Sequence, residues 1–596
     1  MSKGQGTVAA VAVLAALTVI AYGAALQNGY VWDDRFFFTD FKIVEGGAQA
    51  WRAAFEPLFG QTHYVRPLPL LLLYAENILG RHQATLPHAV NLVLHLACAL
   101  MVFLLARRAM DRAMAPSEGW RGWVLPLLLA AVFTVHPALS EAVLWVASRF
   151  DLMASLFMLL ALYAWTSNLS AWPKALLVAL CFFLGALSKE SVVVLPVVLF
   201  VVSMVDRAAQ ERSRPSLSSA LGRPELLGYA CILLAGVAYL AIRFWVLSGA
   251  DPLATGADSV IARLLRFGMS VSKYLQLSFL PFAGLSPQHT FATGEGGLPI
   301  LTSWLPILVA VVLVFTVIMA ALRRNVIGLV LLAWLLAYGP VLHILPLQLN
   351  GNLVHQRFMY FPTALLLALA PYALAHVPVS SAGRRLLWWC GGAAVLVSVM
   401  LVRSIVPMWQ SDLTLWEWTT RADPKSTLAR ENLIWSYVNA DRLEDAEAQL
   451  DVMRQLGMKI GARPAINIGT AYYNRGKYEE ALRFYTAALT TRLNMPPLLR
   501  ASVFSNVAMT HAMLGHVDQA RTFVERGLSE KEYGTNQVAV YLAFCKGESR
   551  RLDEFGPDLV RQALPTVSGA TKMLVTHQPV LYRSGAFCPE TDVTAF

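Results

Sequence analysis

The sequence has 596 residues, of which 56% are hydrophobic and only 14% are charged, and its formal net charge is +10. Soluble domains have about 45–50% apolar and about 25% charged residues, so this composition excludes a single water-soluble domain and indicates a multi-span membrane protein. Most of the positive excess lies in the first 424 residues. That distribution favours basic loops at anionic lipid over a nucleic-acid-binding surface.

Long apolar runs predict about eleven transmembrane helices. The first run follows Lys3 and shows no obvious small-residue cleavage site before Gln27, so we interpret it as an uncleaved span and not as a signal peptide. Segments 66–80 and 263–281 are also apolar but carry charges, which predicts interfacial helices. The expected spans are 7–26, 88–106, 121–137, 150–167, 173–188, 191–205, 226–247, 303–322, 326–345, 359–376 and 386–403.

The basic residues indicate the orientation of these spans. If the count is right, the clusters all fall on one side of the membrane, and positive loops stay in the cytoplasm. The N-terminus is then cytoplasmic, and the odd number of spans places the C-terminal part outside. The clusters are Lys3, Arg107/Arg108/Arg112, Arg207/Arg212/Arg214, Arg323/Arg324 and Arg384/Arg385.

The C-terminal part differs in composition, with 20 Lys+Arg and 18 Asp+Glu in residues 425–596. Segments 437–450, 472–489 and 511–528 align on Ala446, Ala481 and Ala520, which are 35 and 39 residues apart. This pattern resembles the tetratricopeptide repeat of about 34 residues, which predicts a stacked α-solenoid; a helical bundle without a groove is the alternative. Cys545 and Cys588 are candidates for a disulfide, and no cysteine spacing typical of a metal site is present.

An acidic pair, Asp33 and Asp34, directly follows the first span within the segment NGYVWDD. Carboxylates beside the bilayer are costly without a role, and one of two neighbours can act as a general base while the other tunes it. The alternative is a solvated loop with interfacial aromatic residues. We prefer Asp34 slightly as the base, because it lies one residue further from the span.

Further polar residues are expected on the same outward side. His88, Asn91 and His95 share one helix face, as do Glu141, Trp145 and Arg149. Taken singly, such residues are more often intramembrane pairs or snorkelling side chains than site residues. Together they predict a belt of cations and carboxylates, with substrate-binding candidates His63, Arg66, His88, Asn91, Glu141, His355 and Tyr360 and phosphate-binding candidates Arg149, Lys189, Arg243 and Arg357.

Several of these motifs, in this order, resemble one protein family. The WDD after the first span, HYVRPL (63–68), the His-x-x-Asn-x-x-x-His face, the segment 136–151, LSKE and RFMYFP are together similar to the multi-span glycosyltransferases of the C superfamily (GT-C). The group that combines O-mannosyltransferase and tetratricopeptide-repeat parts is the most similar. The resemblance implies an all-α fold, with a GT-C-like membrane domain at 1–410 and a repeat domain at 411–596.

The resemblance also implies an outward-facing site that uses a polyprenyl-phosphate sugar, with the family's acidic pair at Asp33 and Asp34 as catalytic residues. His63 and Gln356 depart from the family pattern, so the sugar and the acceptor stay open. The Ala/Leu/Arg-rich composition and short loops look bacterial, which suggests an inner-membrane protein with a periplasmic repeat domain. The sequence indicates no cofactor with certainty, and a divalent metal stays open.

Three functions follow as hypotheses. The first is transfer of the sugar to a Ser/Thr hydroxyl of an exported protein held by the repeats. The second is the same chemistry on a lipid or glycan acceptor. The third is a membrane scaffold without enzymatic activity that displays a repeat module.

Overall fold

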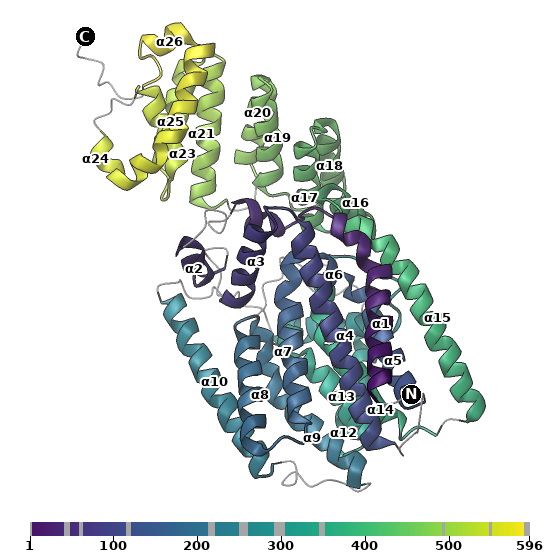
Figure 1. Cartoon of the computed structure of the whole chain (residues 1–596). Coiled ribbons are helices and arrows are strands. Elements are labelled where there is room, and N and C mark those ends of the chain that lie inside the picture. The colour runs from purple at the N-terminus through teal and green to yellow at the C-terminus, as the bar shows by residue number, and fades with distance from the viewer. Residues whose placement is uncertain are drawn as a thin grey trace. The chain divides into compact units, whose positions relative to one another are not determined.

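The computed structural model describes residues 3–40, 48–58, 64–114, 121–211, 221–248, 260–290, 304–344, 352–378, 380–491, 495–546 and 551–588. The chain divides into two compact units, Met1–Pro424 and Lys425–Phe596 (Figure 1). The described residues form helices and one isolated antiparallel bridge, between Thr290 and Asn352. The predicted all-α class is therefore confirmed. Whereas the sequence suggested a boundary at 410, the first unit also includes the helix Asp412–Ala422.

The described residues of the first unit form mainly apolar helices, with short 3-10 turns beside several of them. Its α-helices are α1 (Lys3–Tyr22), α2 (Ala48–Ala54), α3 (Pro67–Leu79), α4 (Thr85–Ala113), α5 (Arg121–Thr134), α6 (Ser140–Leu144), α7 (Arg149–Trp165), α8 (Ala171–Ala186), α9 (Leu195–Glu211), α10 (Arg223–Leu247), α11 (Val260–Phe279), α12 (Trp304–Leu322), α13 (Val326–Ala337), α14 (Tyr360–Leu374), α15 (Ser381–Ile405) and α16 (Asp412–Ala422). Short turns used below are η6 (Glu190–Val194), η10 (Gln356–Met359) and η11 (Val406–Trp409).

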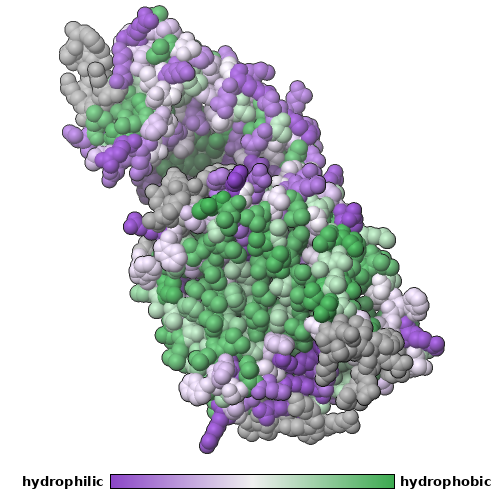
Figure 2. Space-filling view, in the orientation of Figure 1, coloured by the Kyte–Doolittle hydropathy of each residue, from purple (hydrophilic) through white to green (hydrophobic). Residues whose placement is uncertain are grey.

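Eight described helices are long and apolar enough to cross a membrane, or nine if the bent pair Gly122–Thr134 and Pro137–Leu144 is one span. Two further predicted spans correspond to shorter apolar helices, α8 and α13. The expected interfacial segments are the short helix α3 and the helix α11. Figure 2 shows the broad hydrophobic surface that these helices give the first unit. The chain is therefore a multi-span membrane protein.

Helix α4 lies at the centre of the first unit, where it contacts α1, α5, α7 and α14. Its residues Asn91, His95, Cys98 and Val102, spaced three or four apart, are all fully buried, so one continuous stripe of the helix faces its neighbours. Because most of this stripe is polar at the start of α4 and apolar further along, the polar contacts of the core gather at one end of the bundle.

Contacts between helix ends define two opposite ends of the bundle. Thr7 of α1 bonds Arg107 near the end of α4, and Arg112 of α4 pairs with Asp206 of α9. At the other end, Gly29 after α1 donates to the carbonyl of Gln410 after α15, at 3.0 Å. The chain therefore leaves the bundle at the end where α1 terminates, and the N-terminal residues of α1 lie at the other end.

In the second unit, the residues that the structure describes form three helix pairs followed by a helical C-terminal segment (Figure 1). The pairs are α17 (Thr427–Asn439) with α18 (Leu443–Gln455), α19 (Ala462–Asn474) with α20 (Tyr478–Leu489), and α21 (Pro497–Met513) with α22 (Val517–Leu528). The segment contains α23 (Thr535–Phe544), α24 (Leu552–Phe555), α25 (Pro557–His577) and α26 (Pro579–Arg583).

Small residues allow the paired helices to approach closely. Ala446, Ala481 and Ala520 are fully buried, each in the second helix of its pair. A Cβ on Gly469 would lie only 3.0 Å from the Tyr485 ring, so a side chain at that position would push α19 away from α20. The predicted repeat alignment is thus present as three successive helix pairs.

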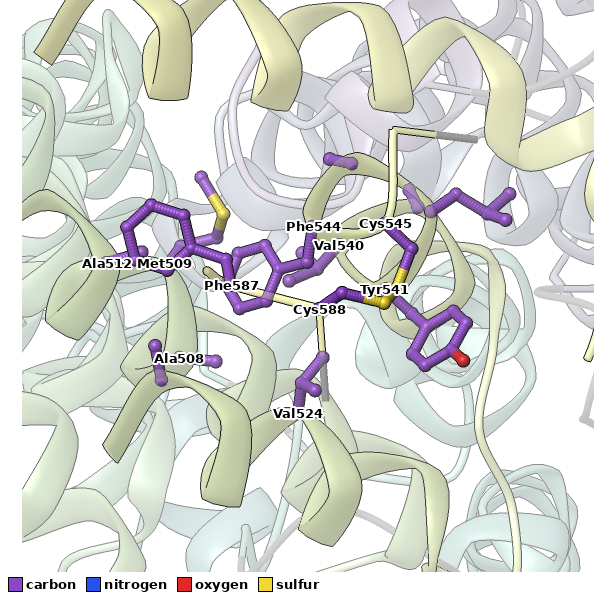
Figure 3. Close-up of a cluster of buried hydrophobic side chains, with 14 of the residues drawn as sticks. Ala508, Met509, Ala512, Val524, Val540, Tyr541, Phe544, Cys545, Phe587 and Cys588 are labelled. Carbon is purple, nitrogen blue, oxygen red and sulfur yellow. A yellow bond between two sulfur atoms is a disulfide. The ribbon is translucent and has the colours of Figure 1, made fainter. Parts of the chain in front are cut away.

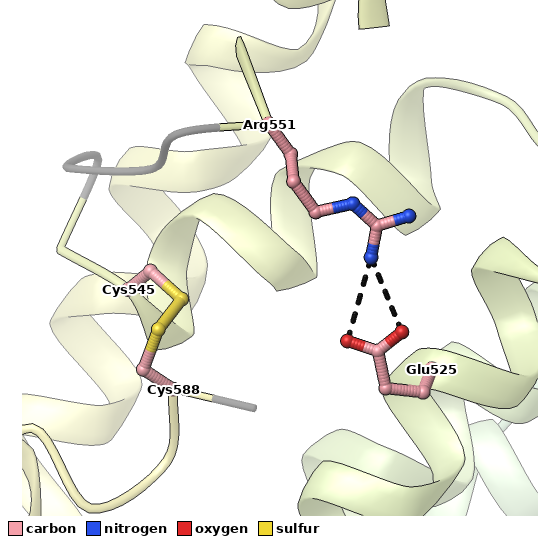
Figure 4. The surroundings of a disulfide bond; sticks show 4 residues. All are labelled: Glu525, Cys545, Arg551 and Cys588. Atoms are coloured by element: carbon pink, nitrogen blue, oxygen red, sulfur yellow. Dashed lines mark hydrogen bonds and ion pairs between the residues drawn. A yellow bond between two sulfur atoms is a disulfide. The ribbon is translucent and has the colours of Figure 1, made fainter. Parts of the chain in front are cut away.

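The C-terminal helices form a hydrophobic cluster on the last pair (Figure 3). Phe544 and Phe587 pack in this cluster with ring centroids 5.5 Å apart. Beside them, a disulfide joins Cys545 and Cys588, as the sequence suggested. Arg551 pairs with Glu525 of α22 next to this bond (Figure 4). These contacts tie the C-terminal segment to the third repeat.

Candidate functional site

The two adjacent aspartates occupy different environments. Asp34 is fully buried, and its carboxylate accepts hydrogen bonds from the backbone N–H groups of Val31 and Ala147, at 3.2 and 2.7 Å. Burial raises the pKa of Asp34, although these bonds act against the shift. Asp34 therefore anchors the segment after α1 to the start of α7. The sequence favoured Asp34 as the base because it lies one residue further from the span. Its burial and its two backbone hydrogen bonds instead hold the Asp34 carboxylate in place.

Asp33 is partly exposed, and among the described residues its carboxylate has no hydrogen-bond or ion-pair partner. Burial raises the pKa of Asp33 to about 6; the charge of Arg357 opposes this shift, and that of Asp412 adds to it. A carboxylate that is accessible, unpartnered and has a pKa near neutrality has the properties of a general base.

Trp32, the residue before Asp33, has a strained backbone conformation that its contacts keep in place. Trp32 has a φ of +55°, a conformation that is unfavourable for a bulky side chain. Its backbone N–H donates to Asp412 of α16 at 2.7 Å, and its ring stacks on Trp145 with centroids 4.5 Å apart. Trp416 contacts the same ring edge-on. Asp412 also pairs with Arg35 at 2.8 Å, so α16 fixes the turn on both sides of Asp33.

Glu141 and Arg357 form the next layer of the site. The buried Glu141 carboxylate accepts from the guanidinium of Arg357 at 2.5 Å and from its backbone N–H at 3.2 Å. The Arg357 guanidinium lies 4.9 Å from the Trp145 ring centroid. His355 lies 3.6 Å from Glu141, and burial lowers its pKa to about 4, so it is neutral at pH 7. Arg357 is thus held by Glu141 close to the acidic pair.

Lys189 and Arg357 face a small pocket between α7, η6, α13, η10 and α14. Lys189 pairs with Asp151, and its ammonium lies 4.5 Å from the Phe358 ring centroid. Burial lowers the pKa of Lys189 to about 8, against the influence of Asp151. The remaining walls are mainly apolar. The lining residues are Asp151, Ser155, Met158, Lys189, Ser191, Val194, Ala337, Pro340, Val341, Arg357, Phe358, Phe361 and Pro362.

Arg66 and Arg243 share a third carboxylate, Glu190. Two nitrogens of Arg66 donate to Glu190 at 3.1 and 2.9 Å, and Arg243 lies 3.7 Å from the other oxygen. The carboxylate of Glu190 does not balance both guanidinium charges, so this cluster carries a net positive charge. Glu190 is the first residue of η6 and directly follows Lys189, which lines the pocket, so this cluster adjoins the pocket along the chain.

Four of the predicted residues are buried connectors. Arg149 has no exposed surface, and it bonds Glu76, the Asn91 side chain and the Pro87 carbonyl. Asn91 in turn donates to two carbonyls near the end of α6. His88 contacts the Gly29 carbonyl at 3.4 Å, and Tyr360 bonds His95 at 2.7 Å. These contacts join α4, α7 and α14 and leave no surface for a ligand.

The structure therefore brings Asp33, Arg66, Glu141, Lys189, Arg243, His355 and Arg357 to one end of the bundle, through the elements described above. His63 lies outside the described residues. The sequence analysis missed the site roles of Asp151, Asp412 and Trp416. Asp151 stood in the quoted segment 136–151, but Asp412 and Trp416 lie some 380 residues from Trp32, and no local pattern signals that contact. Within the described ranges, no group of three or more His, Cys, Asp or Glu could hold a metal ion.

The fold and the site define a multi-span helical membrane protein with a cation-rich, carboxylate-containing end and a repeat domain. A tetratricopeptide-repeat profile matches residues 465–494. Mouse protein O-mannosyl-transferase TMTC3 is 21% identical over 525 residues, which are 80% of this chain and 54% of that protein. Human TMTC1 is 29% identical over 174 residues, 28% of this chain and 19% of that protein.

The chain is thus a weak homologue of these O-mannosyl-transferases, which confirms the resemblance predicted from the sequence. It spans about half the length of mouse TMTC3 (54%) and about a fifth of that of human TMTC1 (19%). A solved structure of the arabinofuranosyltransferase AftD from mycobacteria aligns with 71% of this chain and 29% of its own, with a TM-score of 0.36 and 15% identity.

Proposed function

We propose that this chain is a GT-C glycosyltransferase that moves a sugar from a polyprenyl-phosphate carrier to a Ser/Thr hydroxyl of an exported protein. The observation that carries the proposal is the partly exposed, unpartnered Asp33 carboxylate, with Arg357 near enough for its charge to act on it. A base and a phosphate-binding cation are the two groups that such a transfer needs side by side. The homology to O-mannosyl-transferases supports the same reaction.

In this mechanism, Asp33 takes the proton of the acceptor hydroxyl. The hydroxyl oxygen forms a bond to the anomeric carbon, the bond from that carbon to the phosphate oxygen breaks, and the polyprenyl phosphate leaves with its electron pair. Arg357 and Lys189 stabilise the charge that develops on the phosphate. Lys189 exchanges Asp151 for the phosphate when the donor enters. The apolar walls of the pocket suit the first isoprene units of the carrier.

The distribution of charge and sulfur supports a location of the site outside the cytoplasm. Arg107, Arg112 and Arg207 lie at the bundle end opposite the site, where the positive-inside rule places the cytoplasm. The Cys545–Cys588 disulfide fits an oxidising compartment such as the bacterial periplasm. We infer an inner-membrane protein with periplasmic repeats. An alkaline phosphatase fusion at the C-terminus should be active, and an inactive fusion would contradict this orientation.

Reconstituted transfer tests the reaction itself. The full chain in liposomes receives polyprenyl-phosphate mannose as the donor and an unstructured Ser/Thr peptide as the acceptor. We expect glycosylated peptide and released polyprenyl phosphate in equal amounts by mass spectrometry. If sugar is transferred only to added lipid or glycan acceptors, the proposed protein acceptor is wrong, while transfer from a polyprenyl-phosphate donor stands. No transfer with any polyprenyl-phosphate sugar would contradict the proposal.

A further inference from the structure

Two cations lie close together at the end of the first unit opposite the candidate site. Arg108 lies near the end of α4 and Lys174 near the start of α8, and both side chains are half-buried. The charge of Arg108 is near enough to act on Lys174. Among the residues that the structure describes, neither cation forms an ion pair with a carboxylate.

The carboxylates near these cations are already paired. Asp206 of α9 pairs with Arg112 at 2.6 Å. Glu225 of α10 pairs with Arg207 at 3.3 Å. Both carboxylates act on Lys174 only from a distance, since neither lies within ion-pair reach of its ammonium. Each carboxylate thus compensates the cation with which it pairs, and the two cations of α4 and α8 keep their positive charge uncompensated.

Contacts with neutral groups hold the Arg108 guanidinium and leave one of its edges open. Its Nη1 donates to the Tyr163 carbonyl at 2.5 Å and to the Thr166 hydroxyl at 3.0 Å, and its central carbon lies 3.8 Å from the Tyr163 ring centroid. Within the described ranges, Nε and Nη2 have no hydrogen-bond partner. These two nitrogens form a fork that matches two oxygens of a phosphate. Because the guanidinium is already fixed, binding would cost little side-chain entropy.

The neighbours of Lys174 on α8 place it at the level of lipid headgroups. Trp172, two residues earlier, is 63% exposed, and Leu176, Leu177 and Leu180 are exposed further along the helix. Tryptophan is enriched at the membrane–water interface, whereas exposed leucines of such a helix face acyl chains. Figure 2 shows hydrophilic residues beyond the hydrophobic surface at the lower end of the first unit. Lys174 therefore lies where lipid phosphates are found.

An apolar pocket adjoins Arg108 on the side of the bundle interior. Arg108 and Thr166 line it, as do Leu105 and Leu162, which lie about one helical turn further from the bundle end. Its other walls are mainly apolar residues of α9 and α14. Cationic donors are thus followed by apolar surface, in the order in which a phospholipid presents its phosphate and its hydrocarbon. A free phosphate ion would use only the first part.

We propose that Arg108 and Lys174 bind the phosphate of an anionic phospholipid from the membrane leaflet at this end of the bundle. The Arg108 fork contacts two phosphate oxygens, and the Lys174 ammonium adds a point charge. The uncompensated positive charge favours a lipid with a net negative charge over a zwitterionic one. The bound lipid would join the end of α4 to the start of α8. This binding does not depend on sugar transfer and goes beyond the proposed function.

Native mass spectrometry of the full, delipidated chain in detergent tests the site. The probes are phosphatidylglycerol, phosphatidylcholine and diacylglycerol with identical acyl chains, and inorganic phosphate. We expect one tightly bound phosphatidylglycerol per chain, about 5-fold weaker binding of phosphatidylcholine, and no retention of diacylglycerol or inorganic phosphate. Equal retention of phosphatidylglycerol and diacylglycerol would overturn recognition of the phosphate. Retention of inorganic phosphate without phosphatidylglycerol would overturn the lipid as its source.

Two variants separate the charge from the fork. Lys174→Gln breaks no described side-chain contact and should weaken phosphatidylglycerol binding about 5-fold. Arg108→Lys keeps the charge but loses the fork, and it should weaken binding about 10-fold. The matched control is Arg323→Gln, an exposed cation between α12 and α13. It lies at the same end of the bundle, because Ala337 at the other end of α13 lines the pocket beside Lys189. Its affinity should not change.

Unchanged phosphatidylglycerol affinity in folded Lys174→Gln would contradict the proposal, and this variant decides the matter if Arg108→Lys does not fold. Equal losses in Lys174→Gln and Arg323→Gln would show a diffuse attraction of lipid to basic residues and would also overturn a defined site. Since no sugar donor or acceptor is present, none of these results bears on the proposed function, which the transfer assay tests separately.

Discussion

The charged residues of the two units differ in burial, and the difference separates function from solubility. In the first unit, Arg149–Glu76 and Lys189–Asp151 are ion pairs whose side chains are at most 10% exposed. In the second unit, a pair such as Arg454–Asp451 is 55% and 60% exposed. Buried charges are expensive unless they are paired or used, whereas exposed pairs contribute little. Charge therefore indicates the site in the first unit, whereas in the second unit it keeps the surface of the repeats soluble.

The largest effect on stability is expected at Arg149. Arg149→Ala leaves Glu76 buried without its partner, and breaking such a pair costs about 3–5 kcal/mol. The variant should yield little folded protein by fluorescence-detected size exclusion. The double variant Arg149→Met/Glu76→Met removes both charges and should fold and retain transfer activity. A well-folded but inactive double variant would contradict a purely structural role and restore Arg149 as a phosphate ligand.

Arg357 should affect the rate of transfer; because its loss also leaves the buried Glu141 without its cation, the variants are compared at equal amounts of folded protein. Arg357→Gln removes the cation that faces the leaving phosphate, and loss of one such group typically lowers kcat about 10²–10³-fold. Arg357→Lys should recover only part of this loss, because an ammonium cannot reproduce the fork held by Glu141. Arg207→Gln, at the opposite end of the bundle, is the control. Equal turnover for Arg357→Gln and wild type would move the phosphate site elsewhere.

Asp412 should shift a pH profile. Asp33 acts only when deprotonated, so kcat/KM should fall as the pH drops below about 6, the pKa of this carboxyl. The negative charge of Asp412 raises that pKa; Asp412→Asn removes the charge but keeps an acceptor for the Trp32 N–H. The acidic limb of the profile should therefore move to lower pH. If the acidic limb of the kcat/KM profile keeps its pH or moves to higher pH, ionisation of Asp33 does not set this limb.

The smallest effect is expected in the second unit. Arg454→Ala removes an exposed i,i+3 pair with Asp451 and should change the free energy of unfolding by less than about 0.5 kcal/mol. Thermal melting of the full chain in detergent, followed by circular dichroism, is a sufficient measurement. A loss of several degrees would weaken the contrast between the two units.

The sequence predicts much of this architecture, for identifiable physical reasons. Apolar runs and the repeat period are local patterns, so the spans and the three helix pairs could be predicted. Residues such as Lys189 and Arg357 could be predicted because they are charged residues directly beside apolar runs. The distinction between Asp33 and Asp34 could not be predicted, since it depends on the Ala147 N–H, 113 residues away. The same holds for Asp412, whose contact with Trp32 depends on how α15 returns to α1.

The rate of Asp33→Asn tests the central claim most directly, because the substitution keeps the shape of the side chain and removes its basicity. Transfer from polyprenyl-phosphate mannose to the Ser/Thr peptide is compared at equal amounts of folded protein with that of wild type and of Asp111→Asn, an exposed aspartate near the end of α4. We expect a loss of about 10²–10⁴-fold for Asp33→Asn and none for Asp111→Asn. Wild-type turnover of Asp33→Asn would show that Asp33 is not the base and that the acidic pair is structural.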